Sequence, residues 1–258
     1  MSFKEFLIGG SSGMIARSCV APLDLYKIQR QNHFIPNSTL KAVLKKEGIR
    51  YLWKGNSINC LRVFPQNGIN GFTYNFMKRR GYNHLVSGGI SGGTAMLITY
   101  PLETIRSRIM LQTNHSHYKG LCNALKKLTF REYYLGLNCS LMGYSLYSSL
   151  FFQFYHTYKE LSNDIQINTN AQRLICGGLT GISAVSVSYP TDLVRRRLQI
   201  QGFHTTVPTY NGIIDCCAKI IKKEGIRGLY RGLLPTYYKI FPTVAIQWWC
   251  IDFFTENI

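Results

Sequence analysis

The 258-residue sequence is short of acidic side chains. Twelve Asp and Glu stand against thirty Lys and Arg, which gives a formal net charge of +18. A chain with so few negative charges is expected to meet an anionic partner, such as nucleic acid, phospholipid headgroups or a phosphorylated solute. The composition indicates the sign of the partner's charge and leaves the partner unnamed.

Charged residues of either sign are missing from three stretches, residues 81–102, 133–158 and 174–191. Each stretch is long enough to approach a bilayer span, which a soluble basic protein seldom repeats three times. The stretches are rich in Gly, Ser, Thr and Tyr, and the mean hydropathy of the chain is −0.04. This mixture predicts helices that share a wet interior. Because such long gaps separate the basic groups, we expect no nucleic acid partner.

Motifs of enzymes and metal sites are also missing. The eight cysteines form no C-x-x-C pair and follow no metal-ligand spacing, so we interpret them as reduced packing residues. No Ser-His-Asp order, G-x-x-x-x-G-K-[ST] loop or H-E-x-x-H helix is evident, and the pair of His115 and His117 is typical of a solvated loop. We therefore expect no catalytic residues and no metal. The start, MSFKEFLIGG, lacks the features of a cleavable presequence, so any organelle address is expected to be internal.

Three prolines mark three similar units. A Gly pair begins thirteen residues before Pro22, Pro101 and Pro190, and another Gly lies nine residues before each. After each proline an acid follows two residues on and a base five residues on. These are Asp24 with Lys27, Glu103 with Arg106, and Asp192 with Arg195. The pattern predicts one domain over residues 1–258 with repeats at approximately 1–80, 81–165 and 166–258.

Each repeat is expected to contain a long Gly-lined helix broken at the proline, a short amphipathic helix and a second apolar helix. The long helices are predicted near residues 5–31, 56–78, 83–112, 137–159, 171–201 and 233–255. Short helices are predicted near 38–47 and between Tyr210 and Lys223, where Ser38 and Asn211 could act as caps. The short helices are too polar to span a membrane and are expected along one surface.

The acid and base beside each proline have a physical reason to meet. Proline kinks a membrane helix, and the freed backbone groups need partners. Charges at that depth are costly unless paired, so three acids and three bases on three helices should form a ring of ion pairs. Such a ring could be a gate that breaks and reforms, or a set of static contacts that only specifies the fold.

The order P-x-[DE]-x-x-[KR], then E-G, then aromatic-base-Gly resembles the mitochondrial carrier family over essentially the whole chain. The later elements are Glu47-Gly48 with Trp53-Lys54-Gly55, Glu224-Gly225 with Tyr230-Arg231-Gly232, and only Tyr134 and Gly136 in the middle repeat. The resemblance implies an all-α membrane protein with six transmembrane helices in three pseudo-threefold repeats, short helices on the matrix side and both termini on one side. It also implies a monomeric transporter in the mitochondrial inner membrane.

The resemblance implies two gates. The matrix gate would pair Asp24 with Arg106, Glu103 with Arg195, and Asp192 with Lys27. Gln31 and Gln199 stand where the family braces such pairs, and Met110 is the departure in the middle repeat. The cytoplasmic gate would use Tyr74, Asn75 and Lys78; Tyr155, His156 and Lys159; and Ile251, Asp252 and Thr255. Because only one acid is found in that second set, we expect it to depend on hydrogen bonds and aromatic packing.

Substrate contacts of the family lie near the bilayer midplane, thirteen residues before Asn75, His156 and Asp252. They are Arg62, Gly143 with Tyr144, and Lys239 with Ile240. Two cations suit phosphate and a Gly leaves room for a ring, so an adenine nucleotide is the favoured solute. Resemblance to ADP/ATP carriers adds Arg17, Asn70, Tyr147, Phe151 and Arg196, although Leu198, Gln199 and Ile200 replace the three methionines of that subfamily.

Several alternatives remain at this point. Each of these cations could instead contact lipid headgroups, and Tyr147 and Phe151 could pack between helices. Coenzyme A, thiamine diphosphate, ATP-Mg and phosphate are rival solutes. Gly55 and Gly232 stand where family members bind cardiolipin, with an ordinary aromatic belt as the alternative. Apart from this lipid, no cofactor is expected.

Overall fold

The computed structural model describes residues 3–32, 45, 48–112, 118–162, 169–202 and 208–257. Within these residues the chain forms six long helical segments. They are α1 (Phe3–Cys19) continued by α2 (Ala21–Asn32), α4 (Asn56–Arg79), α5 (His84–Leu111), α8 (Leu137–Ser162), α9 (Thr169–Ile200) and α11 (Leu233–Asn257). The long helices predicted from the sequence are confirmed, with their ends shifted by a few residues.

Short elements connect the long helices. They are η1 (Ile49–Trp53), α6 (Leu121–Lys127), α7 (Phe130–Tyr133), α10 (Ile213–Glu224) and η2 (Ile226–Tyr230). The short helix predicted after Tyr210 is confirmed as α10. Asn211 does not cap α10, because Gly212 directly precedes the helix. The backbone N–H of Asn211 instead donates to Asp215 Oδ2 at 2.9 Å. The short helix predicted near 38–47, with Ser38 as its cap, lies outside the described residues apart from position 45.

The prolines interrupt only the first long segment. Helix α1 ends one residue before α2, and Pro22 lies in the first turn of α2. Pro101 and Pro190 instead lie inside the continuous helices α5 and α9. The predicted breaks at these two positions are therefore wrong. A proline removes a single N–H donor, and the helix can continue where the turns on both sides stay intact.

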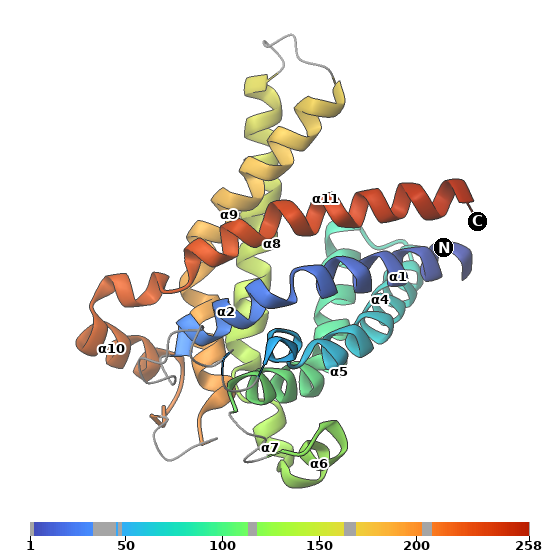
Figure 1. Ribbon diagram of the computed structural model, residues 1–258. Helices are drawn as coiled ribbons and strands as arrows, with labels where there is room; N and C mark the ends of the chain where they lie inside the picture. The colour runs from blue at the N-terminus through green and yellow to red at the C-terminus, as the bar shows by residue number, and fades with distance from the viewer. Residues whose placement is uncertain are drawn as a thin grey trace.

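The long helices form a closed ring. Each long helix contacts the next one in the order α1, α4, α5, α8, α9 and α11, and α11 in turn contacts α1. Figure 1 shows that the helices gather near α7 and α10 and diverge at the other end, where α8 and α9 form an arm that stands away from α11. The two termini lie beside each other at the ends of α1 and α11 (Figure 1).

The Gly nine residues before each proline faces the second long helix of its own repeat. The facing side chains are Val63 for Gly13 at 3.6 Å, Tyr144 for Gly92 at 2.6 Å and Ile240 for Gly181 at 3.9 Å, each measured from a Cβ placed on the glycine. The closest approach is at Gly92, where any side chain would displace the Tyr144 hydroxyl. These glycines allow the paired helices to pack closely.

The residue seven positions after each proline fixes the short elements to the long helices. Arg108, only 1% exposed, pairs with Glu132 of α7 at 3.1 Å, and Arg197 forms two bonds to Glu224 of α10 at 2.6 and 3.0 Å. In the first repeat the Gln29 amide donates to Tyr51 of η1 at 3.2 Å. Burial opposes ionisation of Glu132, but hydrogen bonds from Thr129 and Arg108 outweigh it and lower the pKa of Glu132.

Large apolar side chains lie exposed on the long helices. Examples are Phe72 of α4, Ile98 of α5, Met142 and Phe152 of α8, and Leu234 and Trp249 of α11. An apolar surface of this extent is unusual in a soluble monomer. None of the described helices, however, combines the length and mean hydropathy of a conventional membrane span.

Candidate functional site

Three acids and three bases meet where the helices gather. The pairs are Arg106 Nη2 with Asp24 Oδ2 at 2.8 Å, Lys27 Nζ with Asp192 Oδ2 at 2.7 Å, and Arg195 Nη1 with Glu103 Oε1 at 3.2 Å. The structure thus brings together the partners expected from the repeat. Asp24, Glu103 and Arg106 are each only 5% exposed, a degree of burial that charged groups tolerate when they are paired. The opening of this ring as a gate stays a prediction.

Two of the ring acids each bind one further cation. That cation comes from the second long helix of a different repeat, which is repeat three for Asp24 and repeat one for Glu103. Lys239 Nζ of α11 lies 2.6 Å from Asp24 Oδ1, and Arg62 Nη1 of α4 lies 3.0 Å from Glu103 Oε2. Glu103 also binds Arg196 Nη2 at 3.2 Å. The sequence predicts Arg62, Lys239 and Arg196 as substrate contacts, and the structure places all three on the acids of the ring.

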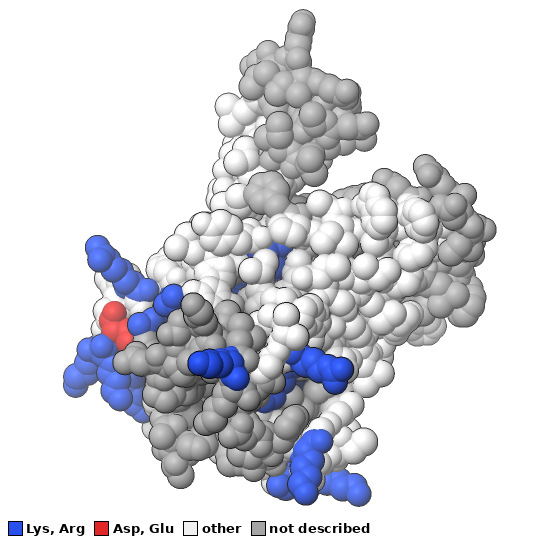
Figure 2. All heavy atoms as spheres, in the orientation of Figure 1, with Lys and Arg blue, Asp and Glu red and all other residues white. Residues whose placement is uncertain are grey.

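The ion-pair ring and the cations that interact with its acids form the floor of the cavity. This floor has more positive than negative charge. Seven described cations interact with three described acids there, so four positive charges are in surplus. The cations are Arg17, Lys27, Arg62, Arg106, Arg195, Arg196 and Lys239, and the acids are Asp24, Glu103 and Asp192. Figure 2 shows Lys and Arg gathered at this end of the molecule, around α10 and the short helices, with a smaller group visible in the middle of the body.

Four guanidinium groups on this floor each have a buried nitrogen with no hydrogen-bond partner among the residues that the structure describes. The nitrogens are Arg17 Nη1, Arg62 Nε, Arg106 Nε and Arg196 Nε. Buried donors of this kind normally have partners, and an unpaired one costs free energy. Together with the charge surplus, they make the floor a site that an anion with several oxygens would stabilise.

The two predicted braces differ in what they hold. Gln31 Nε2 donates to Asp192 at 3.3 Å, as expected for a brace of the Lys27–Asp192 pair. Gln199 Oε1 instead accepts from Arg196 at 3.2 Å and from Ser107 at 3.1 Å. In the middle repeat Met110 is 1% exposed and packs in an apolar cluster with Leu25 and Ile28.

Two buried tyrosines join the ring to the second helices, and our sequence analysis missed them. The Tyr100 hydroxyl donates to the carbonyl of Leu135 at 3.0 Å, and that of Tyr189 donates to the carbonyl of Arg231 at 2.9 Å. Tyr189 also accepts from Gln31 Nε2 at 3.0 Å. The signal was present, because a Tyr-Pro dipeptide occurs at the same place in repeats two and three.

Gly143 lines a cavity of about 250 Å³ between α5, α8 and α9, together with Tyr144, Tyr147 and Thr191. A Cβ at Gly143 would meet Thr191 Oγ1 at 2.7 Å, so this glycine is required by the packing of α8 against α9. The sequence predicts that Gly143 leaves room for a substrate ring, whereas in the structure Thr191 occupies the space that a side chain at Gly143 would take. Tyr144 likewise packs its hydroxyl against Gly92.

Asn70 and Tyr147 line different cavities, and Tyr147 shares its cavity with the ring residues Lys27, Asp192 and Arg195. Asn70 lines an outer cavity of about 380 Å³ with Tyr74, Asn75 and Tyr144. The Tyr147 ring is half-buried and lies 5.9 Å from the ring of Phe151, measured between centroids. Both arrangements leave uncharged polar and aromatic groups beside the charged floor.

The candidates for the cytoplasmic gate lie on the diverging halves of α4, α8 and α11. Asn75, His156 and Lys159 are exposed, and His156 Nδ1 lies 3.3 Å from Glu160 of its own helix. Tyr74 and Lys78 are half-buried on α4. The side chains of Ile251, Asp252 and Thr255 lie outside the described part of α11. The structure does not bring the described members of this set together into a closed layer.

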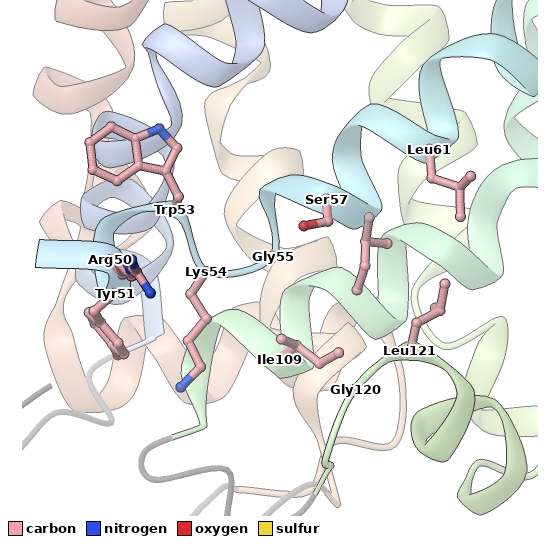
Figure 3. A pocket seen from close by; sticks show the side chains of 11 residues that line it. Arg50, Tyr51, Trp53, Lys54, Gly55, Ser57, Leu61, Ile109, Gly120 and Leu121 are labelled. Carbon is pink, nitrogen blue, oxygen red and sulfur yellow. The ribbon is translucent and has the colours of Figure 1, made fainter. Parts of the chain in front are cut away.

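The two candidate lipid residues each begin a long helix. Gly55 precedes α4 with φ 77° and lines a cavity of about 660 Å³ with Lys54, Ser57 and Gly120. Figure 3 shows the start of α4 on one side of this cavity and Gly120 and Leu121 on the other. Gly232 has φ 89°, and a Cβ there would lie 2.8 Å from the Tyr189 hydroxyl.

The eight cysteines are free thiols, and Cys139, Cys176, Cys216 and Cys250 are buried. Burial raises the pKa of Cys216 to about 12, so this thiol stays protonated at neutral pH. Within the described residues, no group of His, Cys, Asp and Glu is arranged to hold a metal ion. His115 and His117 lie outside those residues.

The chain is similar to known proteins over nearly its whole length. The model of a family described as "Mitochondrial carrier protein" matches residues 2–81, 80–165 and 167–258. Mitochondrial substrate carrier family protein P of Dictyostelium discoideum is 34% identical over 99% of this chain and 94% of its own length. Mitochondrial adenine nucleotide transporter ADNT1 of Arabidopsis thaliana is 31% identical over 94% and 83%, respectively. Mitochondrial thiamine pyrophosphate carrier 1 of Coccidioides immitis is 30% identical over 97% and 91%.

Proposed function

This chain belongs to the mitochondrial carrier family, a family of transporters, and we propose that it exchanges adenine nucleotides across the mitochondrial inner membrane. As a single carrier domain it would alternate access to one central site, with the ion-pair ring as its matrix gate. The observation that carries the proposal is the surplus of four positive charges on the floor of the ring. A solute with neighbouring phosphates would neutralise this surplus.

The chemistry of the floor favours phosphate over a single carboxylate. Arg62, Arg196 and Arg17 each offer a buried guanidinium nitrogen with no hydrogen-bond partner in the described part of the chain, and the planar guanidinium fork matches phosphate oxygens. Lys239 adds a more flexible cation at the same level. An anion with several phosphate oxygens would use these donors together, which supports a nucleoside di- or triphosphate.

The uncharged groups beside the charged floor suit the remainder of a nucleotide. Tyr147 could stack on a base or bond to a ribose, and Asn70 supplies an amide. A thiamine diphosphate substrate is the second candidate, because a relative bears that name and the compound also joins a phosphate pair to flat rings.

Six membrane crossings are supported by the exposed apolar side chains on the outward faces of the long helices. The gathered end, rich in Lys and Arg, would then face the matrix, and the outer mouth would face the cytoplasm (Figure 2). The cavity at Gly55, with Lys54 and Arg50 on its wall, would hold a cardiolipin headgroup, and Gly232 marks the related position in the third repeat.

Reconstitution tests the proposal directly. Liposomes that contain the purified protein and internal ATP are expected to take up labelled ADP or ATP saturably. The change Arg62→Ala should reduce the uptake at least about tenfold, since it removes a charge-assisted contact. Arg79→Ala, on an exposed arginine of the same helix, serves as the control and should leave uptake unchanged. Uptake of thiamine diphosphate, coenzyme A, ATP-Mg or phosphate in place of metal-free nucleotides would reject the nucleotide assignment.

A further inference from the structure

We propose that Asp24 and Glu103 occupy the anion sites of the empty protein and that the substrate must displace them. This inference rests on the proposed function in one respect, namely that the solute is a phosphorylated anion. Each of the two carboxylates would act as a tethered competitor for the substrate. The third acid of the ring, Asp192, would not.

The carboxylate oxygens divide their partners between the ring and the cavity. Asp24 directs Oδ2 to Arg106 and Oδ1 to Lys239, whereas Glu103 directs Oε1 to Arg195 and Oε2 to Arg62. Each acid thus holds one ring base with one oxygen and one predicted substrate cation with the other, and Glu103 Oε1 also holds Arg196 at 3.2 Å. The two bonds can break separately.

Asp192 differs because both of its oxygens bind ring bases. Its Oδ2 lies 2.7 Å from Lys27 Nζ, and its Oδ1 lies 2.9 Å from Arg195 Nε of its own helix. Gln31 adds a bond to the same Oδ2 at 3.3 Å. No substrate cation is paired with Asp192 among the described contacts.

The threefold repeat explains this difference. Lys239 of repeat three binds the acid of repeat one, and Arg62 of repeat one binds the acid of repeat two. By the same rotation, the matching position of repeat two would serve Asp192. That position is Gly143, which lies against Thr191, the neighbour of Asp192. Because repeat two has Gly143 in place of a cation, Asp192 of repeat three has no cation partner from that position.

The arrangement couples occupancy to the ring. Arg62 and Lys239 are partly buried, and the carboxylates stabilise their charges while the site is empty. When phosphates take these cations, Asp24 and Glu103 each lose one of their charged partners. Substrate binding then weakens two of the three ring acids and leaves the Lys27–Asp192 pair with its Gln31 brace intact.

Binding to acid variants of the full-length, purified protein tests the inference. Glu103→Gln and Asp24→Asn each remove a competitor and free a cation, so the Kd for ATP should fall about tenfold, the factor expected for one recovered charge-assisted contact. Asp192→Asn is the matched control. It removes the same charge from the same ring but breaks no direct ion pair with a substrate cation, so any fall in its Kd should be severalfold smaller than in the other two variants.

A second set of variants shows whether the gain passes through the proposed cation. In an Arg62→Gln background, Glu103→Gln should raise the affinity less, because only Arg196 is still freed, whereas the gain from Asp24→Asn should be unchanged. The pair of Asp24→Asn and Lys239→Gln provides the same cycle if Glu103→Gln does not fold. An equal gain in Asp192→Asn, or a gain from Glu103→Gln that is just as large in Arg62→Gln, would overturn the inference.

Inorganic tripolyphosphate is the second probe and separates this inference from the nucleotide assignment. If tripolyphosphate binds with the expected pattern and ATP does not bind, the two carboxylates are competitors and the nucleotide assignment fails. If ATP is transported but the acid variants bind it no more tightly than the unmodified protein, the assignment holds and the inference fails. If no variant binds either anion, both are rejected.

Discussion

Tyr189 connects three segments of the protein through one hydroxyl group. It donates to the carbonyl of Arg231 and accepts from the amide of Gln31, and Lys27 Nζ lies 5.6 Å from the centre of its ring. The side chain is only 1% exposed. A single buried group thus joins α9 to the start of α11 and to the ion-pair ring.

Removing this hydroxyl should destabilise the protein. In Tyr189→Phe the Arg231 carbonyl and the Gln31 amide lose a buried partner, which costs about 1–3 kcal/mol. Thermal unfolding of the purified protein in detergent should show a Tm lower by several degrees. Tyr82→Phe, at a tyrosine that is 48% exposed, is the control and should leave the Tm unchanged. Equal Tm values for the two variants would contradict the role assigned to Tyr189.

Single residues could be predicted only where the repeat marked them. The spacing after each proline identified the three acids and three bases of the ring, and the family resemblance implied which acid meets which base. It could not show that Arg62 and Lys239 reach the ring acids, since that depends on side-chain lengths across the cavity. Gly143 illustrates the limit, because a missing side chain can provide either space for a ligand or close helix packing, and here Thr191 fills it.

The second long helices all begin beside the ring. Gly55, Gly136 and Gly232 each have a left-handed backbone, with φ of 77°, 79° and 89°, directly before the helix. A Cβ on them would meet Met110 at 2.7 Å, the Arg195 carbonyl at 3.0 Å and the Tyr189 hydroxyl at 2.8 Å, respectively. The starts of α4 and α8 therefore fit against the first helix of the next repeat, and the start of α11 fits against Tyr189 of α9.

Gly232→Ala tests this fit. The substitution combines an unfavourable left-handed backbone, worth about 1–2 kcal/mol, with a clash against Tyr189. Gly81→Ala is the matched control, because Gly81 has φ 81° and nothing within 4 Å of its Cβ position. Both variants should lower the Tm, and Gly232→Ala should lower it more and also slow transport. A drop of the same size in both would mean that the backbone strain alone matters.

At the level of elements, the sequence predicted the long helices well and the prolines poorly. Uncharged stretches and Gly spacing located the helices because both depend on local composition. Whether Pro101 or Pro190 interrupts its helix depends on the packing around it, and both helices remain continuous. The cap expected from Asn211 also failed, since Gly212 takes the position before α10.

The molecule as a whole is closed at the ion-pair ring and open at the mouth, which is the end where the diverging halves of α4, α8 and α11 carry the candidates for the cytoplasmic gate. The mouth is short of acids, because Asn75 and His156 stand at two of the three positions where the family has an acid, and Asp252 at the third. His156 contacts Glu160 of its own helix instead of a neighbouring helix. We therefore expect the mouth to close with few ion pairs, so its closed form should be less populated than in a carrier that has all three acids.

Asn75→Glu should increase the population that is closed at the mouth, because it adds an acid with which Lys159 of α8 could pair when the mouth closes. Asn75→Gln is the control without added charge. Asn70→Cys, inside the outer cavity, reports on access when it is labelled by a membrane-impermeant maleimide in proteoliposomes. Labelling should be severalfold slower in the Asn75→Glu background than in the Asn75→Gln background. Equal labelling rates would show that the mouth does not close through charge.

The threefold plan of the molecule could be predicted from the sequence, whereas its departure from threefold symmetry could not. The repeated prolines imply equivalent helices, and the ring of helix contacts follows from them. Only the structure shows that Glu103 and Asp24 each bind a cavity cation of their own and that Asp192 does not. That difference comes from one position, Gly143, whose consequence depends on a partner in another repeat.

The contact between α11 and α1, with both termini beside each other, means that the ring has no structural beginning (Figure 1). A circularly permuted chain, with its old ends joined by a short linker and new ends opened between α8 and α9, would keep every helix neighbour except that one covalent connection. The order in which the three repeats leave the ribosome is therefore arbitrary as far as the architecture is concerned. Only the identity of the residue at each contact position gives one repeat a different task from the others.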